Sequence, residues 1–290
     1  MPAYEGFDAG RREHFPLFLF SPFPYNDAIM DFRIRRQLLV FAVIVFFIAG
    51  IGFLVYSVWA PPSTCSDNRR NQGEEEVDCG GPCSPCIFKL KKDLEVFWTR
   101  AVKVRGNAYD VAAEIYNPNT KLGAVSFEYE FTLVDNAGLA VASRQGKAFI
   151  YPRETMHVIE VGLIARRAIR DASITIRSVE WVLTERIAPD IVSGSREYRI
   201  EEDDGESPRS VAQAIVTNRT LDDLSSVVVG ALLLDGQGNL IGVHSTLLPE
   251  LRAGGSQPVT FIWPEAVPTR VNTIIVEARS RQALLDAPRP

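Results

Sequence analysis

The sequence has few of the residues on which enzyme catalysis most often depends. It holds 3 histidines and 4 cysteines in 290 residues, and every cysteine falls between Cys65 and Cys86. It contains no G-x-S-x-G, no H-E-x-x-H and no phosphate-binding loop. His157 and His244 stand alone in strand-like runs, where a histidine is more often a packed or surface residue than a base. We therefore expect a non-enzymatic protein that needs no cofactor.

The chain also lacks a basic stripe interleaved with aromatic residues, and its formal net charge is -5. Both features argue against nucleic acid as a partner. The composition, 46% hydrophobic and 23% charged, is ordinary for a folded protein. We therefore do not expect wholesale disorder.

One long apolar run, residues 38–60, carries no charged residue. As a helix it would be about 34 Å long, enough to cross a hydrocarbon core of about 30 Å. A buried helix of a soluble domain would show polar residues every third or fourth position. The run therefore predicts a transmembrane helix over residues 38–60, with the lipid bilayer as its surroundings.

The orientation follows from the basic residues that flank this run. Three arginines precede it closely, whereas the first basic residues after it are Arg69 and Arg70; the three are Arg33, Arg35 and Arg36. The positive-inside rule then keeps residues 1–37 as a cytoplasmic tail and places the rest outside the cell membrane. A cleaved signal peptide is the rival interpretation. We favour a single-pass signal-anchor because the run is long, far from Met1 and without an A-x-A site.

The tail before the run has two open features. Residues 14–25 are rich in aromatic residues and proline, which is compatible with an interfacial segment, but three prolines forbid a long helix and favour a simple tail. Met30 is an alternative translation start. If it is the true start, residues 1–29 are absent from the protein.

After the run come the four cysteines, with the spacing C-x13-C-x3-C-x2-C; they are Cys65, Cys79, Cys83 and Cys86. A Gly-Gly-Pro turn at residues 80–82 brings their sulfurs together. Such a cluster forms tetrahedral zinc sites in a reducing compartment and two disulfides in an oxidising one. The predicted orientation places residues 61–86 outside, so we expect two disulfides; three pairings are possible.

Acidic and amide side chains in the same segment raise a further alternative, a calcium site. Their spacing does not match an EF-hand loop, so we expect them to be solvated and name no metal ligand; they are Asp67, Asn68, Asn71, Glu74 and Asp78.

The segment resembles a short motif of microbial surface and membrane-anchored proteins, C-x-D-x-x-x-N-x-x-E-x-x-V-D-C-G-G-x-C-x-x-C. The match runs through Asp67, Asn71, Glu74, Val77 and Asp78, besides Gly80, Gly81 and the four cysteines. The resemblance implies exposure at the cell surface. It implies no activity.

Beyond the cysteines the chain repeats itself at an offset of 100 to 101 residues. The matched segments keep one order: AEIYNPNT with QAIVTNRT, FTLVDNAG with ALLLDGQG, VIEV with PVTF, and SITIRSVEW with NTIIVEARS. Each copy holds short strand candidates separated by turn signals, as antiparallel sandwiches do. We therefore predict a mainly β chain with two tandem antiparallel β-sandwich domains, 87–184 and 185–285, and a tail at 286–290.

The clearest unit of the first copy is a strand in which Phe127, Tyr129, Phe131 and Leu133 alternate, followed by a turn at Asp135. Phe131-Thr-Leu133-Val-Asp135 resembles the FxLYD-type domain, an immunoglobulin-like β-sandwich of secreted and membrane-anchored microbial proteins. Val134 replaces its tyrosine here; in the second copy Leu234 does so and Ala231 replaces its phenylalanine. The resemblance implies an immunoglobulin-like fold and a surface or scaffolding role.

Together these features predict a membrane-anchored surface protein that presents two sandwiches to a membrane or cell-envelope protein. The alternative is an extracytoplasmic module that binds a glycan or a metal ion. Glycan binding favours exposed aromatic platforms, yet Trp98, Trp181 and Trp263 lie in strand-like runs and are expected in the core. The acidic run 201–206 is expected to be a solvated hairpin tip.

Overall fold

The computed structural model describes residues 32–59, 65–202 and 207–285. Residues 1–31, with the proline-rich stretch and Met30, therefore lie outside the described residues, as do the predicted C-terminal tail and most of the acidic run. The chain divides into two units, residues 1–62 and 63–290, which we describe separately.

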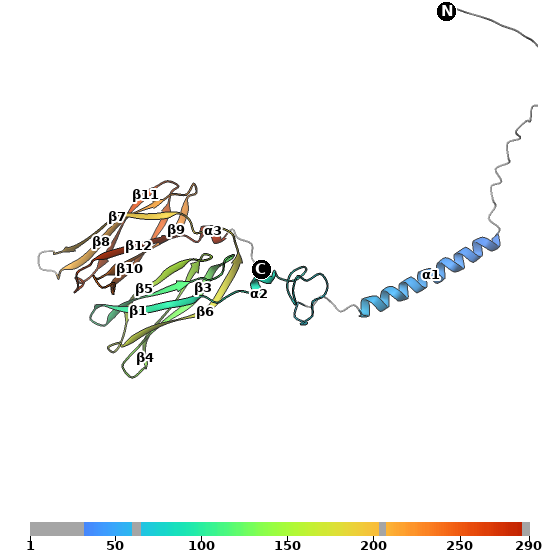
Figure 1. The fold of residues 1–290 in the computed structure, drawn as a ribbon, viewed down its shortest axis with the longest axis horizontal. Helices are drawn as coiled ribbons and strands as arrows, with labels where there is room; N and C mark the ends of the chain where they lie inside the picture. The colour runs from blue at the N-terminus through green and yellow to red at the C-terminus, as the bar shows by residue number, and fades with distance from the viewer. Residues whose placement is uncertain (1–31, 60–64, 203–206, 286–290) are drawn as a thin grey trace, which may run out of the picture. The chain divides into compact units, whose positions relative to one another are not determined.

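The described part of the first unit is one helix, α1 (Phe32–Trp59), drawn in blue in Figure 1. Its apolar part, Ile34–Ser57, has a mean hydropathy of 3.1 and none of it is buried against protein. The helix begins before the predicted start of the span because arginine is a good helix former, so the basic flank is helical too. Such a helix occurs in membrane anchors and in signal sequences alike.

The second unit begins with the cysteine segment. Two disulfides close it, as predicted, and the structure selects one of the three possible pairings, Cys65–Cys83 with Cys79–Cys86. The short helix α2 (Cys86–Lys89) follows, and Ile87 and Phe88 pack against the core of the first sandwich.

After α2, the described residues of this unit form two sets of six strands (Figure 1). The first set consists of β1 (Glu95–Arg105), β2 (Ala108–Tyr116), β3 (Leu122–Val134), β4 (Ala140–Ile150), β5 (Thr155–Ile164) and β6 (Asp171–Leu183). These form two antiparallel sheets with the strand orders β1-β2-β5 and β4-β3-β6.

The second set has the same strand order. It consists of β7 (Ile191–Glu201), β8 (Arg209–Asn218), β9 (Leu224–Leu234), β10 (Leu240–Leu251), β11 (Ser256–Trp263) and β12 (Thr273–Arg279). Its sheets are β7-β8-β11 and β10-β9-β12, and the short helix α3 (Gln282–Leu285) follows. The mainly β architecture with sandwich-like domains is thus confirmed, and the matched sequence segments fall in corresponding strands.

The sandwich cores follow the predicted alternation. On β3 the side chains of Phe127, Tyr129, Phe131 and Leu133 are all buried in the first core. The second core is built in the same way from β8, β9, β11 and β12, with Phe261 and Trp263 among its larger side chains. Burial of every second residue of a strand is what a half-covered sheet requires.

Each copy of the repeat has a buried asparagine at the matched position, and its hydrogen bonds explain why this residue occurs in both copies. Asn117 donates from Nδ2 to the carbonyl oxygens of Leu122 and Tyr151, at 2.8 and 2.9 Å. Asn218 does the same in the second sandwich, to Asp222 at 2.8 Å and Leu251 at 3.0 Å. Because a buried carbonyl needs a partner, each asparagine joins two separate segments of its sandwich by hydrogen bonds to their carbonyl oxygens.

The aspartate turns also correspond. The Oδ1 atom of Asp135 accepts the backbone N–H groups of Ala137 and Leu139, at 2.9 and 3.0 Å. In the second copy Asp235 accepts those of Gln237 and Asn239, at 2.9 and 2.8 Å. An aspartate that bonds its own turn closes each hairpin, as the sequence predicts.

Candidate binding cleft between the two sandwiches

The outer faces of two sheets pack together, β1-β2-β5 of the first sandwich against β10-β9-β12 of the second. The centre of this contact is apolar: Ala112, Leu232 and Val243 are fully buried there, with Trp98 and Ile159 packed against them. The register of the second sheet explains this apolar centre, because Val243, Leu232 and Ile275 form one row across its outer face. Outer-face residues that are apolar on both sheets make the contact favourable.

One glycine lets the sheets approach. A Cβ atom on Gly230 of β9 would lie 2.9 Å from Cδ1 of Ile159 on β5. A side chain at this position would therefore displace Ile159, and a glycine inside a strand often marks such a close approach.

A histidine–glutamate pair joins the sandwiches beside this contact. His157 Nδ1 lies 2.9 Å from Glu277 Oε1, and their side chains are 12% and 30% exposed. The indole of Trp98 lies 5.3 Å from the imidazole of His157. Burial raises the pKa of Glu277, but the hydrogen bond and charge of His157, with the charge of Arg279, outweigh it and hold that pKa below its usual value.

An arginine–glutamate pair makes a second bridge. Arg279 donates to both carboxylate oxygens of Glu154, at 2.7 and 3.1 Å, and to the carbonyl of Phe149 at 3.2 Å. Its guanidinium also lies 4.8 Å from the centre of the Phe149 ring. A planar guanidinium suits this two-pronged contact in a way that lysine does not.

The chain end after β12 extends the same contact. Leu284 of α3 is fully buried among Val125, Phe149, Tyr151 and Val182 of the first sandwich. The Tyr151 hydroxyl donates to the carbonyl of Ser280 at 2.8 Å, and its burial raises the pKa of that phenol. The second copy thus ends on the surface of the first.

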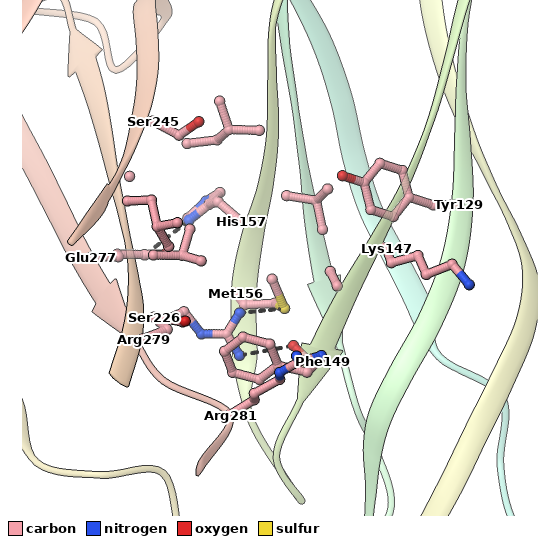
Figure 2. A pocket seen from close by; sticks show the side chains of 16 residues that line it. Tyr129, Lys147, Phe149, Met156, His157, Ser226, Ser245, Glu277, Arg279 and Arg281 are labelled. Atoms are coloured by element: carbon pink, nitrogen blue, oxygen red, sulfur yellow. Dashed lines mark hydrogen bonds and ion pairs between the residues drawn. The ribbon is translucent and has the colours of Figure 1, made fainter. Parts of the chain in front are cut away.

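A cavity of about 250 Å³ lies next to these bridges, with walls from both sandwiches (Figure 2). Two rows of the β10-β9-β12 outer face form one wall: Ser245 with Gly230 and Glu277, then Leu247 with Val228 and Arg279. The opposite wall comes from β4 and β5; it consists of Lys147, Ala148, Phe149, Met156, His157, Val158 and Ile159, with Tyr129 of β3 behind it. The cleft is therefore mainly apolar and is also lined by charged side chains from both sandwiches.

The cysteine segment uses its polar side chains internally. The buried carboxylate of Glu74 accepts the backbone N–H groups of Asn71 and Asp78, and Asp78 accepts that of Asn68 at 3.0 Å. Asp67 accepts the Asn71 side-chain amide at 2.8 Å. Among residues 32–59, 65–202 and 207–285 no group of three or more His, Cys, Asp or Glu side chains is placed to hold a metal ion.

The glycines of this segment are equally specific. Gly80 and Gly81 have φ of +79° and +59°, and a Cβ on Gly81 would lie 2.4 Å from the carbonyl oxygen of Gly73. Only glycine fits such positions, so the Gly-Gly of the motif is a requirement of the loop.

The structure also gives the positions of the flanking arginines, the tryptophans and His244. Arg33, Arg35 and Arg36 lie in the first turns of α1. Trp181 and Trp263 are buried as predicted, and Trp98 lies at the contact between sandwiches instead of in a sandwich core. His244 packs edge-on against Phe261 and Trp263, and burial lowers its pKa.

The sequence did not reveal the groups that bridge the sandwiches, His157 with Glu277 and Arg279 with Glu154. One signal was available. Gly230 interrupts the run VVVGALLL in the middle of a strand, where glycine marks close approach of another element.

Neither a family model nor a curated protein sequence matches this chain. The resemblance to the FxLYD-type domain therefore stays a prediction.

Among solved structures, a red sea bream transglutaminase aligns at 12% identity and a TM-score of 0.21, over 65% of this chain and 29% of its own. The chain thus spans less than a third of that protein. The tandem CBM22-1–CBM22-2 domains of Paenibacillus barcinonensis Xyn10C align at 8% identity and a TM-score of 0.14, over 64% of this chain and 85% of theirs. At these TM-scores neither likeness bears on function.

Proposed function

We propose that the protein is a non-enzymatic, single-pass membrane protein with its N-terminus in the cytoplasm and its two sandwiches outside the cell. The observation that carries the proposal is α1, whose apolar stretch Ile34–Ser57 is entirely unburied. Exposing so many large apolar side chains to water would be strongly unfavourable, whereas a bilayer would cover them. The arginines at its N-terminal end favour the cytoplasmic side for that end.

The disulfides support the same orientation. Two disulfides within a short segment persist in oxidising compartments and are rare in the cytosol. The segment follows α1 closely in sequence, so the side of the membrane on which it lies is also the side of the sandwiches.

The sandwiches support an interaction role. They pack on one another through a buried apolar centre and two polar bridges, so a partner would meet one composite surface instead of two independent modules. The FxLYD-type, immunoglobulin-like resemblance and the cysteine motif suit a scaffolding role at the surface of a microbial cell. We propose a membrane or cell-envelope protein as the partner.

Two single-cysteine reporters test the orientation in intact cells. Leu221 is 97% exposed on the second sandwich and Gln37 directly precedes the uncharged run at residues 38–60, while the native cysteines are engaged in disulfides. We expect Leu221→Cys to react with a membrane-impermeant maleimide in intact cells and Gln37→Cys to react only after permeabilisation. The reverse pattern would overturn the proposal. Loss of an N-terminal epitope from the mature protein would instead identify α1 as a cleaved signal sequence.

Crosslinking tests the interaction role. A photo-crosslinking amino acid placed at Leu221 or at Ile187, which is 82% exposed, should give discrete protein adducts on intact cells that mass spectrometry identifies as envelope or membrane proteins. Absence of discrete adducts from a series of such exposed positions would count against a protein partner.

The cleft favours a second candidate function, the binding of a small ligand outside the cell. It is concave, mainly apolar and lined by a few polar groups from both sandwiches, which is the usual make-up of a small-molecule site.

A further inference from the structure

We propose that the cleft between the sandwiches binds a small amphiphilic anion, a carboxylate joined to a short hydrocarbon portion. This inference rests on the second candidate function above and names its ligand class. It does not depend on which side of the membrane the sandwiches lie.

The hydrocarbon portion is indicated by the walls. Val228 and Leu247, neighbours on β9 and β10, are 42% and 57% exposed and both face the cleft. Phe149, Val158 and Ile159 line it from the first sandwich. A hydrocarbon chain laid here would remove the exposed apolar surfaces of Val228 and Leu247 from water; Phe149 and Val158 are themselves only 8% and 3% exposed.

The size of the cleft limits the ligand. A volume of about 250 Å³ holds roughly eight groups the size of a water molecule, at about 30 Å³ each. A chain of about eight carbons, with its head group at the rim, fits this space.

The anionic head group is indicated by charge. The lining includes the cationic side chains of Lys147, Arg279 and Arg281, and one carboxylate, that of Glu277. Two of these cations already have partners, since Lys147 lies 2.8 Å from Glu128 and Arg279 binds Glu154.

Arg281 is different, because its guanidinium makes no hydrogen bond or ion pair with any side chain in the part of the chain that the structure describes. It follows Arg279 by two residues and lines the end of the cleft near Phe149 in Figure 2. A guanidinium can bind both oxygens of a carboxylate at once. We therefore assign Arg281 as the group that holds the head group.

Two hydroxyls add polar contacts. Among the described residues the side chains of Ser226 and Ser245 have no hydrogen-bond partner, and both line the cleft. Ser226 has φ of +53°, a left-handed conformation that serine rarely adopts and that is often found at functional sites.

Other ligand classes fit less well. A cation would be repelled by the guanidinium of Arg281, whose charge no described side chain balances, whereas Lys147 and Arg279 are paired with Glu128 and Glu154. A sugar ring would need an open aromatic face, yet the guanidinium of Arg279 lies over the Phe149 ring, and Tyr129 is buried with its hydroxyl bonded to Glu160 at 2.8 Å.

Photoaffinity labelling of the full chain in lipid nanodiscs tests the proposal. The probe is an eight-carbon carboxylate with a diazirine in its chain, and peptide mass spectrometry locates the adducts. We expect adducts on the β9 and β10 peptides that contain Val228 and Leu247. Excess octanoate should abolish them, whereas octylamine at the same concentration should not.

Variants make the test specific. Arg281→Gln should lower the adduct yield on these peptides at least fivefold, and Leu247→Asp should lower it comparably. Arg252→Gln, an exposed arginine of the same sandwich away from the cleft, is the matched control and should label like the parent. Near-UV circular dichroism verifies that each variant is folded.

Three outcomes would overturn the inference: adducts confined to α1 or spread over the surface, equal competition by octylamine, or unchanged labelling of Arg281→Gln. Because nanodiscs expose both sides of the bilayer, none of these outcomes bears on the membrane orientation. The cysteine reporters in intact cells test that separately.

Discussion

Ile159 on β5 occupies the space that Gly230 on β9 leaves open, so that a Cβ on the glycine would approach Cδ1 of the isoleucine to 2.9 Å. This relationship joins two strands of different sandwiches. It sets how closely their sheets approach, and therefore whether His157 can reach Glu277 beside it.

Replacing Gly230 tests whether the two sandwiches unfold as one cooperative unit. Gly230→Leu should separate the sheets and destabilise their contact by about 1–3 kcal/mol, the usual cost of overpacking. We expect calorimetry to resolve two transitions where the parent shows one. Gly230→Ala should have a smaller effect, because only the flexible end of Ile159 has to move.

Gly236→Ala is the matched control, since a Cβ there has nothing within 4 Å. Two transitions already present in the parent would show that the contact does not couple the sandwiches.

The Arg279–Glu154 bridge should matter more than an ordinary surface pair. These side chains are only 13% and 18% exposed, so removing one partner leaves the other charge poorly solvated. We expect Glu154→Gln to lower the free energy of unfolding by about 3 kcal/mol, measured by urea denaturation. The exposed ion pair of Lys121 and Glu185, whose side chains are 58% and 83% exposed, provides the control. Lys121→Gln should change the free energy of unfolding by less than about 1 kcal/mol. Equal effects of the two changes would contradict a structural role for the bridge.

Local features of the fold were predictable and the contact between sandwiches was not. The alternation along β3 and the turn at Asp135 depend on neighbours in sequence, so strand period and turn chemistry predict them. The contact depends on pairs such as His157 and Glu277, which lie 120 residues apart. Nothing in either strand alone indicates which outer face will be covered.

The disulfide pairing illustrates a second limit. The orientation argument predicts disulfides over zinc, but spacing alone does not rank three pairings. The pairing of Cys65 with Cys83 is set by the loop between them, where Glu74 and Asp78 fix backbone amides and Gly81 passes close to Gly73.

Asp110 should make stability depend on pH in an unusual direction. Burial raises the pKa of Asp110 to about 6. The Gly162 N–H, which donates to the carboxylate, lowers this pKa by a smaller amount. The folded state therefore binds a proton more tightly than the unfolded state, whose pKa is 3.8. This contribution to stability is present below pH 3.8, declines as the pH rises towards 6, and stays lost above it.

Asp110→Asn should accordingly raise the free energy of unfolding at pH 7, by up to about 3 kcal/mol, and change it little at pH 4. The comparison variant is Asp235→Asn. Hydrogen bonds from Asn239 lower the pKa of Asp235, so losing its charge should destabilise the fold at pH 7. Equal effects of Asp110→Asn at both pH values would contradict the raised pKa.

Glu74 should hold the cysteine loop together through its backbone hydrogen bonds and should not bind a cation. Its carboxylate is only 6% exposed and accepts two backbone N–H groups, from Asn71 at 3.3 Å and Asp78 at 3.2 Å. Glu74→Ala would leave these amides without their acceptor, at a cost of about 1–3 kcal/mol. We expect dithiothreitol to reduce the disulfides of this variant at least tenfold faster than those of the parent. Mass-shift labelling of the freed thiols measures the rate. The exposed neighbour Glu76, changed to alanine, should leave the rate near that of the parent. Because Oε2 of Glu74 already accepts both backbone N–H groups, we expect calcium and EDTA not to alter the parent's rate. Slower reduction in calcium, lost in Glu74→Ala, would instead assign a cation to the loop.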